Sequence, residues 1–239
     1  MIKYLVKKVS DIKEEIDSIY KELLESKYQF VIIRKDNKYV CLTKEKSLIE
    51  ISNLERFINE AKEDIYYKSI KEDIHKVNKE DLNKYYSYLE KFKEEITSEV
   101  YGDKYLFGSV AVRVNDGFIT TIRGKEDLSD YAYVNYVDHL NKIVSVKDKK
   151  ASLNAPLLAT LFENKKVDVI VHINHSYDKS LDSYDYAFPG SVRDSLRNLS
   201  KSFNISNHGV FYLIDSKGEI IRWGIHIIGN MKVFIKDIF

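Results

Sequence analysis

The 239-residue chain has little of what characterises secreted and membrane proteins. Cys41 is its one cysteine, so no disulfide can form within the chain, and this usage favours a reducing compartment. No apolar run approaches the roughly 20 residues of a membrane-spanning helix, and the apolar stretch near Met1 is too short for a signal peptide. We therefore expect a cytoplasmic protein with no membrane partner.

The chain also lacks an excess of either charge. Its 38 Lys and Arg residues balance 37 Asp and Glu residues, for a formal net charge of +1. This balance gives no reason to expect a nucleic-acid partner. A chain of this length can bury a substantial core, as one large domain or as a domain with a smaller appendage.

The first part of the chain, residues 1–78, predicts a small α+β unit of unknown role. Ser10-Asp11-Ile12 begins a pattern of apolar residues at helical spacing. Residues 28–33 and 38–43 read as two strands joined by a turn at Asp36-Asn37. A second helix, capped by Ser52 or Asn53, is expected to run to about Ala61.

Residues 64–80 are dense in charge and predict a linker or an exposed helix, so we place a domain boundary between residues 78 and 79. Residues 79–239 then begin with an amphipathic helix that reaches about Ser98. Short strands interleaved with helices follow from Tyr105 onward. This order predicts an α/β fold in which helices cover a central mixed sheet.

The most informative stretch is Val167-Asp-Val-Ile-Val-His-Ile-Asn-His-Ser-Tyr177. Its β-branched residues predict a buried strand, which runs directly into His172, Asn174 and His175. Polar side chains of the ligand type at the end of a buried strand have the rigid support and open mouth that a metal or catalytic site needs. This stretch is therefore the candidate centre of the site.

Five short motifs, in order, resemble the class II aldolase/adducin family. They cover about the C-terminal 150 residues, and together they are more specific than any one of them. They are Gly108-Ser-Val-Ala-Val-Arg113, Ile119-Thr-Thr-Ile-Arg-Gly124, Lys150-Ala-Ser-Leu-Asn-Ala-Pro-Leu157, Ile170-Val-His-Ile-Asn-His-Ser-Tyr177 and Asn207-His-Gly-Val210.

The resemblance implies a class II aldolase-like αβα sandwich, with a site that holds a divalent metal, usually zinc. It implies His172 and His208 as metal ligands, with Asn174 or His175 as the third. The ion would polarise a carbonyl group and stabilise an enediolate. The resemblance further implies a small phosphorylated or carbonyl ligand and a homo-oligomer such as a tetramer.

The same resemblance places the ligand's phosphate on backbone amides and side chains of two loops. The corresponding loops of this chain form a candidate anion site. Arg123 is introduced there relative to the family, and it could hold an anion bidentately or be merely solvated. That site consists of Gly108, Ser109, Arg123, Gly124 and Ser152.

Two positions depart from the family in ways that matter chemically. Asn154 stands where the family has the glutamate that acts as acid and base, and an amide cannot shuttle a proton. Asn174 stands at the second histidine of the strand, and an amide oxygen is a weaker zinc ligand than imidazole. His175 would take its place only with a bulge, because positions i and i+3 of a regular strand face opposite sides.

The sequence leaves two functions open. The first is a metal-dependent aldehyde-lyase-like enzyme with an altered site, acting on a small phosphorylated sugar or carbonyl compound. The second is a non-catalytic module that keeps the fold for ligand binding or assembly. For His175 the default interpretation is a hydrogen-bonded structural histidine, and for His172 with His208 metal binding and a structural role both stay open.

Overall fold

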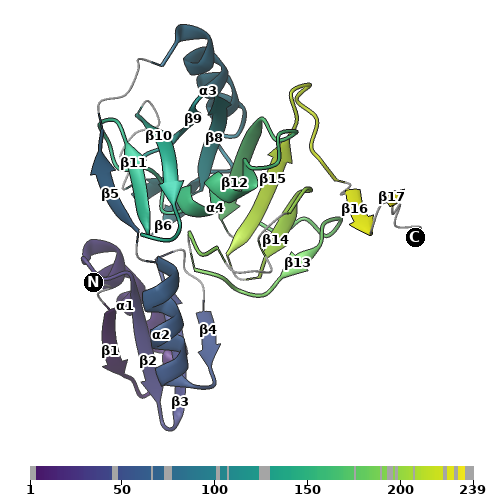
Figure 1. Cartoon of the computed structure of the whole chain (residues 1–239). Coiled ribbons are helices and arrows are strands. Elements are labelled where there is room, and N and C mark those ends of the chain that lie inside the picture. Colours follow the sequence, from purple (N-terminus) through teal and green to yellow (C-terminus); the bar gives the residue numbers. More distant parts are fainter. Residues whose placement is uncertain are drawn as a thin grey trace. The chain divides into compact units, whose positions relative to one another are not determined.

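The computed structural model describes residues 4–44, 48–65, 67–72, 77–100, 103–106, 108–123, 130–174, 176–188, 190–192, 196, 199–206, 208–222, 225–228 and 231–234. The chain divides into two compact units, Met1–Tyr66 (unit 1) and Tyr67–Phe239 (unit 2). Figure 1 shows both units with their elements labelled. Each unit is considered by itself below.

Unit 1 is a four-stranded sheet with two helices. The sequence predicts both helices and the two hairpin strands, and the structure adds the two outer strands. Asp11 accepts hydrogen bonds from the amides of Lys13 and Glu14, so it caps the first helix. The sheet order is β1-β2-β3-β4, in which β1 and β2 are parallel and the other neighbours are antiparallel. The elements are β1 (Tyr4–Lys8), α1 (Ile12–Glu25), β2 (Phe30–Lys35), β3 (Lys38–Thr43), β4 (Leu48–Ile51) and α2 (Leu54–Ile65).

Unit 2 is built on a nine-stranded mixed sheet in the order β13-β14-β15-β12-β8-β9-β10-β11-β5. Two further pairs, β6 with β7 and β16 with β17, form small separate sheets. The elements are β5 (Lys68–Lys71), α3 (Lys79–Lys91), β6 (Thr97–Val100), β7 (Asp103–Leu106), β8 (Ser109–Val114), β9 (Gly117–Thr121), β10 (Tyr131–Asp138), β11 (Ile143–Val146), α4 (Ala155–Leu161), β12 (Val169–Asn174), β13 (Ser183–Tyr184), β14 (Phe203–Ile205), β15 (Gly209–Ile214), β16 (Ile225–Ile228) and β17 (Met231–Phe234).

Helices α3 and α4 pack against opposite faces of the large sheet. Leu157 and Leu161 of α4 share a buried apolar cluster with Ile170 of β12. Tyr85 of α3 shares a different cluster with Val169 and other strand residues. Because neighbouring residues of a strand point to opposite faces, α4 and α3 cover the sheet from its two sides. The continuous apolar run of β12 follows from this burial on both faces.

The boundary between the two units falls between residues 66 and 67, earlier in the chain than the boundary after residue 78 that the sequence predicts. Residues 68–71 form β5, which pairs in parallel with β11 at the edge of the large sheet. The amide of Glu72 also donates to the carbonyl of Val146 at 3.0 Å. The charged stretch therefore contains an edge strand of unit 2. Its short alternation of Lys, Ser, Ile and Lys carries little apolar signal, since an edge strand needs only one buried face.

The described architecture is α/β with a mixed sheet, in agreement with the fold class predicted from the sequence. The helix from residue 79 ends at Lys91, earlier than predicted, and its last turn leads through Phe92 and Ile96 into β6. Across the described residues, no helix combines the length and the apolar character needed to cross a membrane.

Candidate functional site

The structure brings His172 and His208 together. His172 lies near the end of β12, directly opposite Phe211 of β15. His208 lies in the turn between β14 and β15, where its amide donates to the carbonyl of Ile205 at 3.0 Å. The two imidazole centroids are 4.8 Å apart with the rings at 80°, and each residue is only 1% exposed. Two histidines that are distant in the chain thus form one buried pair.

Two glycines allow the backbone to approach closely at this pair. Gly209 follows His208 with φ +143°, and a Cβ atom there would lie 2.2 Å from the carbonyl oxygen of Ile173. Gly108 has φ +76°, and a Cβ atom there would lie 2.4 Å from the carbonyl oxygen of His172. Any side chain at either position would push the strands apart. These glycines therefore keep β8, β12 and β15 in register around the histidines.

Asn154 lies beside His172 and is held at both ends of its amide. The residue stands at the N-cap position of α4, yet its side chain does not cap that helix. Its Nδ2 lies 3.0 Å from Nδ1 of His172. Its Oδ1 accepts a 2.9 Å hydrogen bond from the amide of Gly190. The side chain is 5% exposed. It makes its hydrogen bonds to His172 and Gly190 and makes none to the N-terminus of α4.

These two contacts determine which way the amide of Asn154 points. A backbone N–H can only donate, so the atom of Asn154 that faces Gly190 must be oxygen. The NH₂ group therefore faces His172, and Nδ1 of His172 must accept a hydrogen bond. A neutral imidazole that accepts at Nδ1 carries its proton on Nε2. Phe211 stacks on the ring at 4.2 Å and 15°, which fixes its plane.

This arrangement can be compared with what a zinc ion requires. A histidine that binds zinc through Nε2 presents a lone pair there and donates its Nδ1–H to an acceptor. His172 has the opposite arrangement, because Asn154 donates to its Nδ1. Within the described residues, no three His, Cys, Asp or Glu side chains are grouped for a metal ion. The residues described at this site therefore do not fit a metal held through Nε2 of His172.

Of the two other predicted metal ligands, the structure describes Asn174 but not His175. Asn174 lies opposite Gly209 in an unbroken register with β15, so it faces the same side of the sheet as His172. Its Oδ1 is buried without a hydrogen-bond partner among the described residues. His175 lies outside the described residues.

The predicted anion site lies along the same end of the sheet. Ser109 is opposite His172 in the β8–β12 register and is 1% exposed. The amide of Ser152 donates to the carbonyl of Thr121 at 2.9 Å, while the amide of Arg123 donates to the carbonyl of Lys150 at 2.9 Å. The side chain of Arg123 is exposed. Gly124 lies outside the described residues.

Several buried hydroxyl groups have no hydrogen-bond partner among the described residues. They are the Oγ atoms of Ser109 and Ser191 and the Oγ1 atoms of Thr120 and Thr121, and Ser109 lies opposite His172. Buried hydroxyls normally have a partner, and leaving one unpaired costs free energy. Ser152 differs, because its Oγ accepts a 3.3 Å hydrogen bond from the backbone N–H of Asn154. The unpaired hydroxyls suit a small polar ligand.

Sequence reasoning missed several members of the site. Phe211 is not among the predicted site residues, although it stacks on the ring of His172. Gly190 has φ +83° and supplies the donor to Asn154. Tyr186 has its ring centroid 6.3 Å from that of His208. The Pro-Gly-Ser triplet at 189–191 predicts the start of a helix, and no pattern in the sequence indicates which side chain the backbone amide of Gly190 would meet.

A second polar cluster fixes the loop after the site strand. Asn204 is fully buried in β14, and its Nδ2 donates to the carbonyls of Asp178 at 2.9 Å and Leu181 at 3.2 Å. The Asp178 carboxylate accepts from Ser180, and this bond, assisted by Arg222, lowers the pKa of Asp178. The polar groups of this cluster supply one another's hydrogen bonds, which is typical of a cluster that holds a loop in place.

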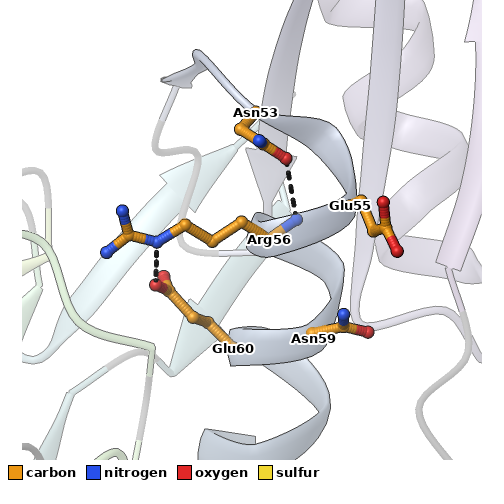
Figure 2. A pocket seen from close by; sticks show the side chains of 5 residues that line it. All are labelled: Asn53, Glu55, Arg56, Asn59 and Glu60. Carbon is orange, nitrogen blue, oxygen red and sulfur yellow. Dashed lines mark hydrogen bonds and ion pairs between the residues drawn. The ribbon is translucent and has the colours of Figure 1, made fainter.

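A surface pocket also occurs in unit 1, on α2, and it is lined by Asn53, Glu55, Arg56, Asn59 and Glu60. Figure 2 shows that Asn53, Arg56 and Glu60 contact one another along the helix. Asn53 accepts from the amide of Arg56 at 2.9 Å, and Arg56 binds Glu60 at 2.7 Å. Since these are capping and i,i+4 contacts on an exposed face, the candidate site remains the histidine pair.

Comparison with known proteins finds similarity in solved structures. No family model matches the chain, and no curated protein matches it. The chain is similar to YgbL of Klebsiella pneumoniae, described as a "putative aldolase/epimerase/decarboxylase", with 16% identity and a TM-score of 0.42 over 57% of this chain and 79% of that chain. It is also similar to YgbL of Escherichia coli, with 16% identity and a TM-score of 0.39 over 55% of this chain and 75% of that chain.

Proposed function

We propose that the protein is a ligand-binding module built on a class II aldolase-like αβα sandwich. The histidine pair and the surrounding hydroxyls would bind a small phosphorylated or carbonyl compound, without cleaving a carbon–carbon bond. Three features support this proposal: the buried His172–His208 pair, the unpaired hydroxyls beside it and the amide of Asn154 at the acid/base position of the family.

The single observation that carries the proposal is the environment of Asn154. Its amide donates to His172 and accepts from Gly190, so both ends of the group are occupied. An amide also has no proton to exchange near neutral pH, so it cannot act as a general base. The position that would carry proton transfer instead holds His172 in one orientation.

The burial of the site limits the ligand that it can take. Ser109, His172 and His208 are each 1% exposed, so these side chains are shielded from solvent and would suit only a small ligand. A small ligand with several acceptor oxygens would satisfy the hydroxyls that lack partners among the described residues. Phosphate and phosphorylated three-carbon carbonyl compounds have this character, and Arg123 would contribute positive charge at the exposed margin.

Thermal unfolding with inorganic phosphate and with dihydroxyacetone phosphate tests the binding. Both ligands should raise the melting temperature saturably, since a ligand that binds only the native state stabilises it. Arg123→Ala should weaken this response. Arg56→Ala, which alters an exposed arginine of unit 1 (side chain 77% exposed), is the matched control and should leave the response unchanged. Absence of stabilisation in the wild type would contradict ligand binding.

A cleavage assay tests the absence of aldol chemistry. Incubation of the purified protein with phosphorylated ketoses of five and six carbons should release no aldehyde above the rate without protein. Release that is lost in His208→Ala would contradict the proposal and support a lyase.

The metal-dependent lyase is the second candidate, and the proximity of the two imidazoles favours it. It would require His172 to present a lone pair at Nε2, and hence the amide of Asn154 to turn around. Purified protein would then contain close to one divalent ion per chain, and His208→Ala would remove it. Unchanged metal content and melting temperature in that variant would exclude this candidate.

The assembly state is a further part of the proposal. The family resemblance implies a homo-oligomer, such as a tetramer, in which the sites lie at subunit interfaces. Sedimentation analysis with and without phosphate measures the state directly, and a monomer at all concentrations would contradict it.

A further inference from the structure

We propose that Asn154 is a positioning residue that sets the tautomer of His172. By keeping the proton on Nε2, it makes the histidine pair a hydrogen-bonding site and prevents it from holding a divalent metal ion. The residue at 154 would thus decide between the two kinds of ligand. This inference rests on the proposed function, because it takes the histidine pair as a ligand site. Its nitrogen NMR test requires no ligand, so the tautomer assignment and the proposed function can fail independently of each other.

The first step of the argument is the fixed direction of the amide. Gly190 donates its N–H at 2.9 Å to Oδ1 of Asn154, and the backbone of Gly190 packs closely against that of Leu153. Its φ is +83°, and its α-carbon lies against the carbonyl oxygen of Leu153, where a Cβ atom would approach to 2.2 Å. Turning the amide around would set its NH₂ group against this N–H and lose the hydrogen bond.

The second step is the ring of His172. Its Nδ1 faces the NH₂ group of Asn154 at 3.0 Å. The stacked ring of Phe211 on one side and the edge of His208 leave little room for the imidazole to rotate. The ring therefore cannot avoid the amide, and its Nδ1 must remain an acceptor.

The third step is the effect of a carboxylate at the same position, as in the Asn154→Asp variant. Asp has the shape of Asn, so one oxygen of the introduced carboxylate would still accept from Gly190 while the other faced Nδ1 of His172. A carboxylate accepts and does not donate, so the imidazole would move its proton to Nδ1 and expose a lone pair at Nε2. In zinc sites, a histidine that binds the ion through one ring nitrogen commonly donates the N–H of its other ring nitrogen to such a carboxylate.

Nitrogen NMR of the full-length protein, labelled with ¹⁵N-histidine, tests the tautomer. Long-range ¹H–¹⁵N spectra distinguish a protonated ring nitrogen from a bare one, and His172→Gln assigns the signals. The wild type should show a bare Nδ1 and a protonated Nε2 at His172, and Asn154→Asp should show the reverse. A protonated Nδ1 in the wild type overturns the inference, and this result does not depend on whether the variant folds.

Zinc binding measured by calorimetry supplies the second readout. Asn154→Asp should bind Zn²⁺ about 10- to 100-fold more tightly than the wild type, the range that such carboxylates contribute. Asn154→Ala, which removes the donor without adding an acceptor, should fall well short of this gain. His208→Ala in the Asn154→Asp background should abolish it. Equal affinity in the wild type and Asn154→Asp, lost in both on His208→Ala, would overturn the inference.

Discussion

The cores of the two units differ in what they bury. The interior of unit 1 is almost entirely apolar, with Ile32, Ile33 and Leu42 completely buried. Unit 2 buries histidine, asparagine, serine and threonine side chains, several of them at the end of the large sheet that carries His172. Among the described residues, every buried polar side chain except Thr43 belongs to unit 2.

This difference separates a core that contributes mainly to stability, in unit 1, from a core that also buries groups of little benefit to stability, in unit 2. An apolar core is stabilised by the surface it removes from water, about 25 cal/mol per Å². Buried hydroxyls and imidazoles add little of this and cost free energy wherever they lack partners. Ser109 and His172 belong to β8 and β12, and His208 immediately precedes β15, which is where the proposed ligand site lies. The buried residues of unit 1 are almost all apolar, as a core that serves only stability requires.

The largest expected effect is on the apolar core of unit 1. Leu42→Ala should lower the free energy of unfolding by about 2–5 kcal/mol, because it removes a fully buried side chain and leaves a cavity. Urea denaturation measures the loss. The phosphate response of the melting temperature should persist, since no member of the site comes from unit 1. A lost response would erase the contrast between the units.

The next effect concerns the polar network of unit 2. Asn154→Ala should cost about 2–4 kcal/mol, because it leaves the amide of Gly190 and Nδ1 of His172 without this partner. Asn53→Ala in unit 1 is the matched control. It removes an exposed helix cap and should cost only about 1 kcal/mol. Equal losses in the two variants would show that the buried amide has no special role.

The polar cluster after the site strand should give a pH-dependent effect. Its hydrogen bond from Ser180, with help from Arg222, lowers the pKa of Asp178, so the folded state favours the carboxylate. The stabilisation is then complete above the unfolded pKa of about 3.9 and is lost as pH falls through the lower folded value. Asp178→Asn should be less stable at pH 7, with a smaller further loss in acid than the wild type. Parallel acid profiles in urea would contradict this.

The smallest expected effect on stability is at Ser109. Its Oγ is buried without a partner among the described residues, so Ser109→Ala should change the free energy of unfolding by less than about 0.5 kcal/mol or raise it. The same variant should weaken the response to phosphate. A destabilisation comparable with that of Asn154→Ala would show that the hydroxyl is structural.

Local patterns in the sequence predicted the strand at the centre of the site. The apolar run of β12 reflects the burial of neighbouring residues on both faces of the sheet. The edge strand at 68–71 escaped prediction because half of it faces water and its neighbour, β11, is distant in the chain.

The sequence by itself determined that His172 stands at the end of a buried strand, that His208 precedes a glycine, and that position 154 carries an amide. Only the tertiary structure decided that the two rings lie 4.8 Å apart and that Gly190 orients the amide against His172. The physical reason is that residue identity fixes which protons a group can give or accept. Which partner meets that group depends on segments that the chain folds together from far apart.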